Sequence, residues 1–210
     1  MSLKIRTLGL TDYEPVWRDM QAFTNNRDAH TADEIWFTEH KPVFTLGVNA
    51  SREHVLAPGD IPVVQIDRGG QVTYHGPGQL MVYPLLDLRR GNTGVRTLVT
   101  ALEQSVVDLA AEFGLQAASS REAPGVYVDG VKLASVGLRV RRGASFHGMA
   151  VNIDMDLEPF SRINPCGYAE LKVTDFARLG ASMSLQQAEQ RLLPHFLAHL
   201  NRQDASIVAA

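Results

Sequence analysis

Short apolar segments separated by glycine and proline are the feature that most limits the fold of this chain. Between residues 34 and 88 they read as strands: IWFTEH, PVFTLG, IPVVQID, QVTY and LMVYPLLDL. Two further runs, GVYV and VKLASVGLRV, flank Asp129-Gly130, a pair typical of a two-residue hairpin turn, and SFHGMAVNID reads as another strand. A chain with this many strands must build a sheet, so the helices have to be placed around it.

Three helical patterns precede, separate and follow the strand runs. Thr11, with a glutamate three residues later, resembles a capping box and predicts a helix over about 12–27. Leucine, valine and phenylalanine recur on one stripe of residues 95–113, and a glycine follows as a C-terminal cap. A second capping-box pattern at Ser184 predicts the last helix, in which Pro194 marks a kink or a break.

This order predicts an α+β fold, a mixed β-sheet with flanking helices, in a single domain over residues 1–210. A small C-terminal subdomain from about residue 165 is the alternative division. The composition, 45% hydrophobic over 210 residues, is enough for a full core. The net charge of −3 gives no global field for nucleic acid or for an anionic membrane. The longest apolar run, Leu80–Leu86, is too short to span a bilayer, and the N-terminus lacks a signal-peptide pattern, so we expect a soluble, cytoplasmic protein.

The stretch RGGQVTYHGPGQL, residues 68–80, packs four glycines, a proline and a histidine into thirteen positions. A phosphate-binding loop would need a helix N-terminus or Gly-Lys-Ser/Thr after the glycines, and here strands follow instead. A metal site is disfavoured because His75 has no second ligand at a familiar spacing. Tight turns in a sheet explain Gly69-Gly70, while glycines on both sides of Thr73 and Tyr74 favour close approach of an apolar ligand to the backbone.

The single cysteine, Cys166, excludes an internal disulfide and is either a small buried side chain or a nucleophile. Pro165 and Gly167 place it in a turn, which favours a surface or cleft. A reactive thiolate needs a cation beside it, and the candidate is Lys132. Alternation along the strand after the hairpin turn puts this lysine on the more apolar face. The Lys132 ammonium is either buried with a partner, or it reaches solvent through its flexible side chain or through a bulge in the strand.

Two histidines, His147 and His75, are alternative partners of the cysteine in a Cys/His pair. His195 and His199 have a spacing that can bind metal, but they flank a buried-face phenylalanine on the last helix and are better explained as residues at the solvent border. No metal site is predicted.

Three segments together resemble the lipoate–protein ligase B family, the octanoyl-[acyl-carrier-protein]:protein N-octanoyltransferases. They are RGGQVTYHGPGQLMVY, GVKLASVGLRVRRGASFHGMAVNIDMDL and INPCGY, and they occur in the family's order between about Asp33 and Tyr168. The resemblance implies the fold of the biotin/lipoate protein ligase catalytic domain. It also implies transfer of an octanoyl group from octanoyl-acyl carrier protein to a lysine of a lipoyl domain, a step of lipoate assembly and protein lipoylation.

The same resemblance implies the site residues. The family's acyl-thioester cysteine falls on Cys166, and the lysine that lowers its pKa falls on Lys132. The acyl-binding segments fall on three stretches: Arg68, Gly69, Gly70, Gln71, Val72, Thr73, Tyr74 and His75; Ser135, Val136 and Gly137; Gly148, Met149 and Ala150.

A thioester is already activated, so the implied enzyme needs no ATP and no cofactor, in keeping with the missing phosphate loop. Its implied partners are octanoyl-acyl carrier protein and the lipoyl domains of 2-oxo acid dehydrogenases and of the glycine cleavage H protein, with neither nucleic acid nor membrane. Arginines at Arg89-Arg90, Arg139 and Arg141-Arg142 are candidate contacts for such acidic carriers, or else solvated surface charges. The rival hypotheses are an ATP-dependent ligase of the same fold and a non-catalytic acyl- or carrier-binding module.

Overall fold

The computed structural model describes residues 2–120, 123–164, 172–202 and 206–209. Within them, eight strands form one mixed sheet in the order β11-β1-β2-β6-β10-β9-β8-β7, parallel at β11-β1-β2 and antiparallel elsewhere. These strands are β1 (Ser2–Thr11), β2 (Asp33–His40), β6 (Gln79–Leu85), β7 (Ala117–Ser119), β8 (Gly125–Val128), β9 (Val131–Arg141), β10 (Ala144–Asn152) and β11 (Ser206–Ala209). The predicted mixed sheet is confirmed.

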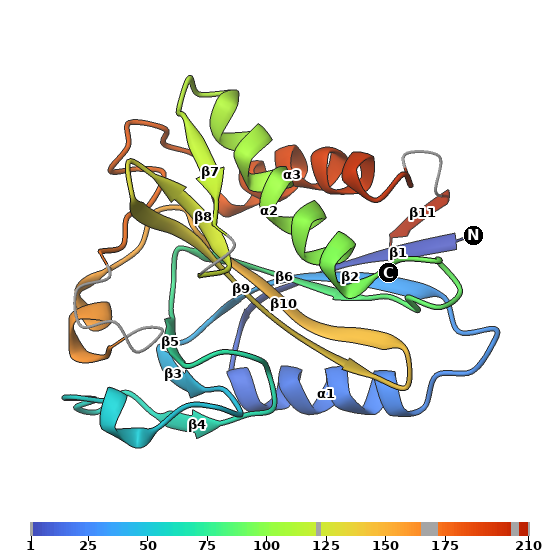
Figure 1. The fold of residues 1–210 in the computed structure, drawn as a ribbon, viewed down its shortest axis with the longest axis horizontal. Coiled ribbons are helices and arrows are strands. Elements are labelled where there is room, and N and C mark those ends of the chain that lie inside the picture. Colours follow the sequence, from blue (N-terminus) through green and yellow to red (C-terminus); the bar gives the residue numbers. More distant parts are fainter. Residues whose placement is uncertain (1, 121–122, 165–171, 203–205, 210) are drawn as a thin grey trace.

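A second, three-stranded sheet lies beside the main one in the described part of the chain (Figure 1). Its order is β4-β3-β5, and its strands are β3 (Val43–Leu46), β4 (Val63–Gln65) and β5 (Val72–His75). Short 3₁₀ turns occur at Arg52–His54 and Glu158–Arg162. The glycine-rich stretch therefore runs from the small sheet into β6 of the large one.

Three helices in the described residues cover the main sheet on both faces (Figure 1). Helices α2 (Val95–Ala111) and α3 (Leu185–His199) pack against each other on one face, while α1 (Tyr13–Asn25) lies across the opposite face. The core under α2 and α3 includes Leu102 and Phe196, both fully buried, and the core under α1 includes Met20 and Tyr83. The sheet is therefore apolar on both faces, as its near-continuous burial requires. No helix among the described residues is long and apolar enough to cross a membrane.

Helix starts and turns follow the sequence patterns with one exception. Ser184 and Gln187 form the predicted capping box, and Pro194 lies inside α3 without ending it. Asp129 and Gly130 both have positive φ, +49° and +78°, as the predicted hairpin turn requires.

The capping box predicted at Thr11 is wrong. Asp12 is the N-cap of α1, without a side-chain cap hydrogen bond, and Thr11 ends strand β1. The threonine hydroxyl lies instead within hydrogen-bond distance of the Thr38 hydroxyl and of His40 Nδ1 on the neighbouring strand β2, at 2.9 and 3.0 Å. Pairing between strands competes with local capping for the same hydroxyl, and sequence pattern alone does not separate the two.

A buried carboxylate, Asp33, ties the start of the interior strand β2 to three arginines. Asp33 accepts hydrogen bonds from Arg27, from Arg90 at 2.7 Å and from Arg202 at 2.7 Å, and from the backbone N–H of Asp87 at 2.8 Å. Burial raises the pKa of Asp33, but these hydrogen bonds and charges outweigh it and hold the pKa below its usual value. Arg90 is therefore a structural residue and does not belong with the surface arginines.

Candidate active site

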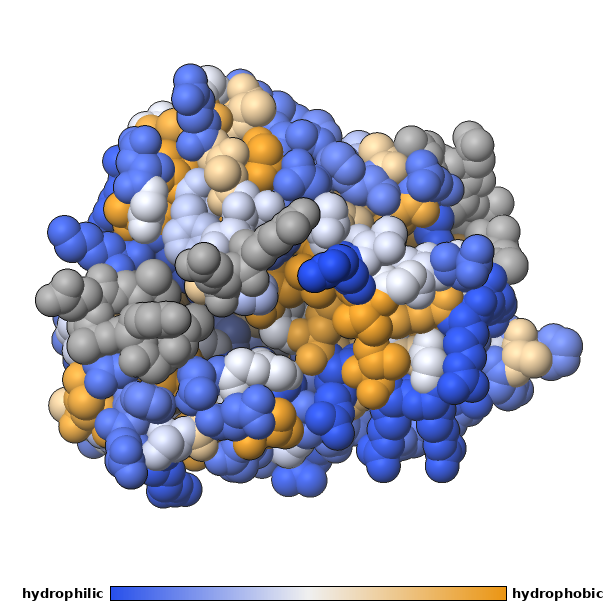
Figure 2. Space-filling model, in the orientation of Figure 1, coloured by the Kyte–Doolittle hydropathy of each residue, from blue (hydrophilic) through white to orange (hydrophobic). Residues whose placement is uncertain are grey.

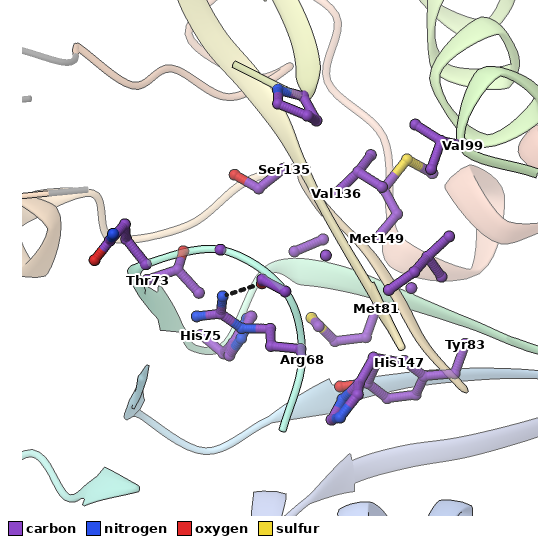
Figure 3. A pocket seen from close by; sticks show the side chains of 18 of the residues that line it. Arg68, Thr73, His75, Met81, Tyr83, Val99, Ser135, Val136, His147 and Met149 are labelled. Carbon is purple, nitrogen blue, oxygen red and sulfur yellow. Dashed lines mark hydrogen bonds between the residues drawn. The ribbon is translucent and has the colours of Figure 1, made fainter. Parts of the chain in front are cut away.

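A cavity of about 330 Å³ lies between the glycine-rich segment and strands β9 and β10. The volume is in the range of small-ligand pockets, about 300–1,000 Å³. Its walls are mostly apolar, and Met81, Val136 and Met149 are among the side chains that line it (Figure 3). Such a cavity suits an alkyl chain better than a charged nucleotide.

Most residues predicted to bind the acyl group line this cavity. They are Arg68, Gly69, Gly70, Gln71, Val72, Thr73, His75, Ser135, Val136, Gly137, Gly148, Met149 and Ala150, and Lys132 joins them. Tyr74 is not among the lining residues, since its ring packs between Phe44 and Phe160 in the small-sheet core. Alternation along β5 places Thr73 and His75 on the face opposite to Tyr74, while Val72 lines the cavity from the first position of the strand.

Arg68 braces the cavity wall from inside the protein. Its guanidinium is buried and donates to the backbone and side-chain oxygens of Thr45 at 2.8 and 3.0 Å. A further bond reaches the Gly69 carbonyl oxygen at 2.9 Å (Figure 3). The side chain thus ties the glycine-rich segment to β3 of the small sheet.

Lys132 is buried, with 3% of its surface exposed, so its stem does not return the ammonium to solvent. Its Nζ lies 5.4 Å from the centre of the Tyr127 ring, a cation–π contact across the β8–β9 hairpin. Gly125 makes room for the side chain. A Cβ at this position would lie 3.0 Å from Lys132 Cε and 2.4 Å from the Ala134 carbonyl oxygen.

A carboxylate from helix α2 shares the surroundings of Lys132. Glu103 is only 7% exposed and accepts the backbone N–H of Gly125 at 2.9 Å. Burial raises the pKa of Glu103, and this N–H and the charge of Lys132 oppose the rise without cancelling it. Sequence reasoning missed Glu103, because it found no acidic residue on the lysine's own strand. The only signal is an acidic residue beside the apolar stripe of residues 95–113.

Cys166 lies outside the described residues, which stop at Asn164 and resume at Lys172. The first described residues after this gap pair with the backbone of Lys132. The Lys132 N–H donates to the Lys172 carbonyl oxygen, and the Thr174 N–H donates to the Lys132 carbonyl oxygen, both at 2.9 Å. The sequence after the cysteine is thus bound to the backbone of Lys132.

A buried hydrogen-bond network connects His75 to Thr174, in the segment that pairs with Lys132. Gln79 Nε2 donates to Asn152 Oδ1 at 2.9 Å, so its Oε1 accepts from His75 Nδ1 at 2.8 Å, and Asn152 Nδ2 donates to the Thr174 carbonyl oxygen at 2.8 Å. The other ring nitrogen of His75 lies 3.3 Å from Thr45 Oγ1. Burial holds the pKa of His75 well below its usual value, so the ring is neutral and both nitrogens are engaged by side chains.

His147 lines the cavity and pairs with the carboxylate of Asp67. Its Nε2 lies 2.8 Å from Asp67 Oδ1, and 1% of its surface is exposed. Sequence reasoning named the histidine but not Asp67, nor the cavity-lining Tyr13 and Tyr83. Tyr83 and Met81 sit two apart on β6, so alternation would place them on one face once the strand is known to border a cavity.

The glycines of the motif have two different jobs. Gly69 and Gly70 line the cavity as expected, whereas Gly76 and Gly78, the glycines on the other side of Thr73 and Tyr74 that were also expected to let an apolar ligand approach the backbone, do not line it. A Cβ on Gly78 would lie 1.8 Å from the Asp154 carbonyl oxygen, at a backbone φ of +84°. Gly78 thus allows the turn before β6 to pack tightly against the chain after β10, whereas a Cβ on Gly76 would lie 2.2 Å from the Tyr74 hydroxyl oxygen.

His195 and His199 hold α3 to α2. Their Nε2 atoms lie 2.7 Å from Glu112 Oε1 and 2.6 Å from Asp108 Oδ2, and both side chains are partly exposed. Their place is the solvent border of the interhelical contact, remote from the cavity lining.

Comparison with known proteins decides the family. A sequence model described as the lipoyl protein ligase A/B catalytic domain matches residues 12–197. This chain belongs to that family. An octanoyltransferase of Chromobacterium violaceum is 56% identical over 94% of this chain and 95% of its own, and one of Shewanella amazonensis is 58% identical over 91% and 88%.

Solved structures of the family's fold are more distant in sequence. The bipartite lipoate protein ligase of Thermoplasma acidophilum aligns with a TM-score of 0.76 at 16% identity, over 100% of this chain and 86% of that one. The biotin protein ligase of Aquifex aeolicus aligns with a TM-score of 0.56 at 11% identity, over 96% and 72%. The predicted biotin/lipoate ligase catalytic fold is confirmed, and at these identities the fold is all that these two comparisons establish.

Proposed function

We propose that this protein transfers an octanoyl group from octanoyl-acyl carrier protein to the lysine amine of lipoyl domains, through a thioester on Cys166. One observation carries the proposal: an apolar cavity lined by the predicted acyl-binding residues has the buried Lys132 in its wall. The octanoyltransferase name of relatives at 56–58% identity points to the same acyl group.

The proposed chemistry pairs the buried Lys132 with the thiol of Cys166. An ammonium at Lys132 stabilises the thiolate of Cys166, because a nearby positive charge lowers the pKa of a thiol. The thiolate attacks the octanoyl carbonyl, the carrier's thiolate leaves and takes the proton of the Lys132 ammonium, and the octanoyl group remains on Cys166 beside a now neutral Lys132. The acceptor amine then attacks this thioester, the cysteine leaves as thiolate, and Lys132 in its neutral form accepts the amine's proton.

The backbone around Lys132 supports this assignment. The described chain on the C-terminal side of Cys166 is hydrogen-bonded to the Lys132 backbone through Lys172 and Thr174. The cysteine thus precedes, by six residues in the sequence, a segment that pairs with the lysine.

The carriers that bring donor and acceptor are proposed to meet the surface beside the cavity. Val95 lines both the cavity and an adjoining groove that contains Val140 and Arg89. Figure 2 shows apolar side chains gathered on this face next to strongly hydrophilic ones. Arg89, Arg139 and the Arg141-Arg142 pair are exposed and suit an acidic carrier.

Intact mass measurement tests the proposal. The protein is incubated with octanoyl-acyl carrier protein without ATP, and the Cys166→Ala variant serves as the control. We expect an octanoyl adduct on the wild type and none on the variant, followed by loss of the adduct when a lipoyl domain is added. A requirement for ATP would favour an adenylate-forming ligase, and acyl binding without an adduct would favour a non-catalytic module.

A further inference from the structure

His147 holds a backbone conformation that its position in a strand does not explain. Its φ is +57°, in the left-handed region that non-glycine residues rarely adopt. The register of β10 against β6 pairs Met149 with Val82, and its continuation places His147 opposite Pro84. Pro84 has no N–H to donate, so the ladder is interrupted there and β10 is free to turn one side chain. Strain of this kind persists only where surrounding contacts hold it.

The contact that holds it is the carboxylate of Asp67. This carboxylate also accepts hydrogen bonds from Trp17 Nε1 at 2.9 Å and Gln21 Nε2 at 3.2 Å, both on helix α1. Burial raises the pKa of Asp67, but the hydrogen bonds from His147 and Trp17 outweigh it, so the group is ionised. An ionised carboxylate only accepts, and His147 Nε2 must therefore carry the proton that it donates.

Asp67 sits immediately before the cavity wall formed by Arg68, Gly69 and Gly70, whereas His147 belongs to the facing wall on β10. Besides the side-chain pair, the Gly69 N–H donates to the Leu138 carbonyl oxygen on β9 at 3.1 Å. The carboxylate thus joins three separate elements, namely α1, the glycine-rich segment and the sheet. A shift of this segment would change the distance between the two walls.

We propose that Asp67 and His147 form a clasp that holds the two walls of the cavity against the acyl chain, so that each methylene contributes to binding and an octanoyl donor is preferred to a shorter one. Both are positioning residues that act through the segment carrying Arg68 to Gln71. The inference rests on the proposed octanoyl transfer, and it names the residue pair that fits the cavity to one class of straight-chain acyl group.

Two substitutions at His147 separate the hydrogen bond from the strained backbone. Asparagine tolerates the left-handed region but is too short to reach Asp67, whereas the amide nitrogen of glutamine extends about as far as Nε2 of histidine. The kcat/KM values for octanoyl and hexanoyl carrier-protein donors are measured for wild type, His147→Asn and His147→Gln. One methylene in a fitted pocket changes kcat/KM by about 10- to 200-fold. We expect His147→Asn to reduce the octanoyl-to-hexanoyl ratio by about tenfold or more and His147→Gln to stay within about threefold of wild type.

The control is His195→Asn, which removes a histidine–carboxylate contact outside the cavity and should leave the ratio unchanged. A purely structural role for His147 would lower the melting temperature without altering the ratio, and that result overturns the clasp. Equal loss in the asparagine and glutamine variants overturns it as well. If His147→Asn does not fold, Trp17→Phe is used instead, because it removes one hydrogen-bond donor to Asp67. The octanoyl-to-hexanoyl ratio should then fall in this variant, and an unchanged ratio overturns the clasp. A wild type without octanoyl transfer refutes the proposed function itself, which keeps the two failures distinct.

Discussion

Replacement of Lys132 by methionine should abolish most activity while leaving the protein folded. Methionine has a similar unbranched shape and fills the space beside Tyr127 and Gly125 without a charge. The positive charge of Lys132 now lowers the pKa of Glu103, against the effect of burial. Without that charge the pKa of Glu103 rises further, so the buried carboxyl group is more easily protonated and carries no unpaired charge. A protonated Glu103 still accepts the Gly125 N–H.

Loss of the cation–π contact and release of the buried ammonium change the stability in opposite directions. Loss of a desolvated cation–π contact costs about 2 kcal/mol, and release of an ammonium that is 3% exposed returns a few kcal/mol of desolvation. For a chain of 210 residues about 1 kcal/mol moves Tm by roughly 2–4 °C, so we expect a Tm within about 4 °C of wild type. A thiol with a pKa near 8.5 is a few per cent thiolate at pH 7, and a shift of about two units is worth roughly 25-fold. Loss of a proton acceptor adds about 10²- to 10⁴-fold.

The assay is single-turnover octanoyl transfer at pH 7, run beside a thermal melt of the same preparation. We expect transfer to fall by about 10³-fold or more at nearly constant Tm. Lys41→Met is the matched control, because Lys41 is exposed and pairs only at the surface with Asp12 at 3.1 Å. Transfer by the Lys132 variant within tenfold of wild type would refute the reasoning, as would a loss fully explained by unfolded protein.

Three further perturbations test other parts of the molecule. Gly78→Ala should lower Tm by several degrees, because its Cβ would clash with the Asp154 carbonyl oxygen at a positive φ; an unchanged melt would contradict this. Burial raises the pKa of Glu112, but hydrogen bonds from His195 and Arg191 on α3 outweigh it and hold the pKa below its usual 4.5. The ionised Glu112 therefore stabilises the fold above pH 4.5, and this stabilisation is lost as the pH falls below that value. Urea titrations of wild type and Glu112→Gln should show a flatter acid limb for the variant. Charge reversal at Arg141 and Arg142 should raise KM for the carrier-protein donor with kcat unchanged, and an equal KM would remove their docking role.

Local chemistry made most of the secondary structure predictable. The Asp129-Gly130 turn and the Ser184 cap are decided by a few neighbouring residues, and the structure confirms both. Strand β1 was missed, because SLKIRTLGLT alternates weakly and is held by β2 and β11 on either side. The division of the strands into two sheets depends on long-range pairing, which no local pattern encodes.

The candidate site was predictable only where a motif marks it. Residues 68–75 and 148–150 were expected at an acyl site, and most of them line one cavity. Asp67 and Glu103 were not expected, since each acts on a residue far away in sequence, His147 and Lys132. When two interacting residues lie on different elements, no spacing in the sequence connects them. Their contact and their burial are apparent only once those elements are packed together in the fold.

The shared fold does not by itself choose between ligase and transferase chemistry. Lipoate and biotin protein ligases align with this chain at 10–16% identity, so the same sheet and helices carry very different sequences. What the fold supplies is a cavity between a glycine-rich segment and two strands. An activated thioester needs only a nucleophile and a proton acceptor at the end of that cavity, whereas a free acid also needs groups that bind a nucleotide. In the proposed function Cys166 and the buried Lys132 meet the first requirement, which is the physical reason to expect acyl transfer without ATP.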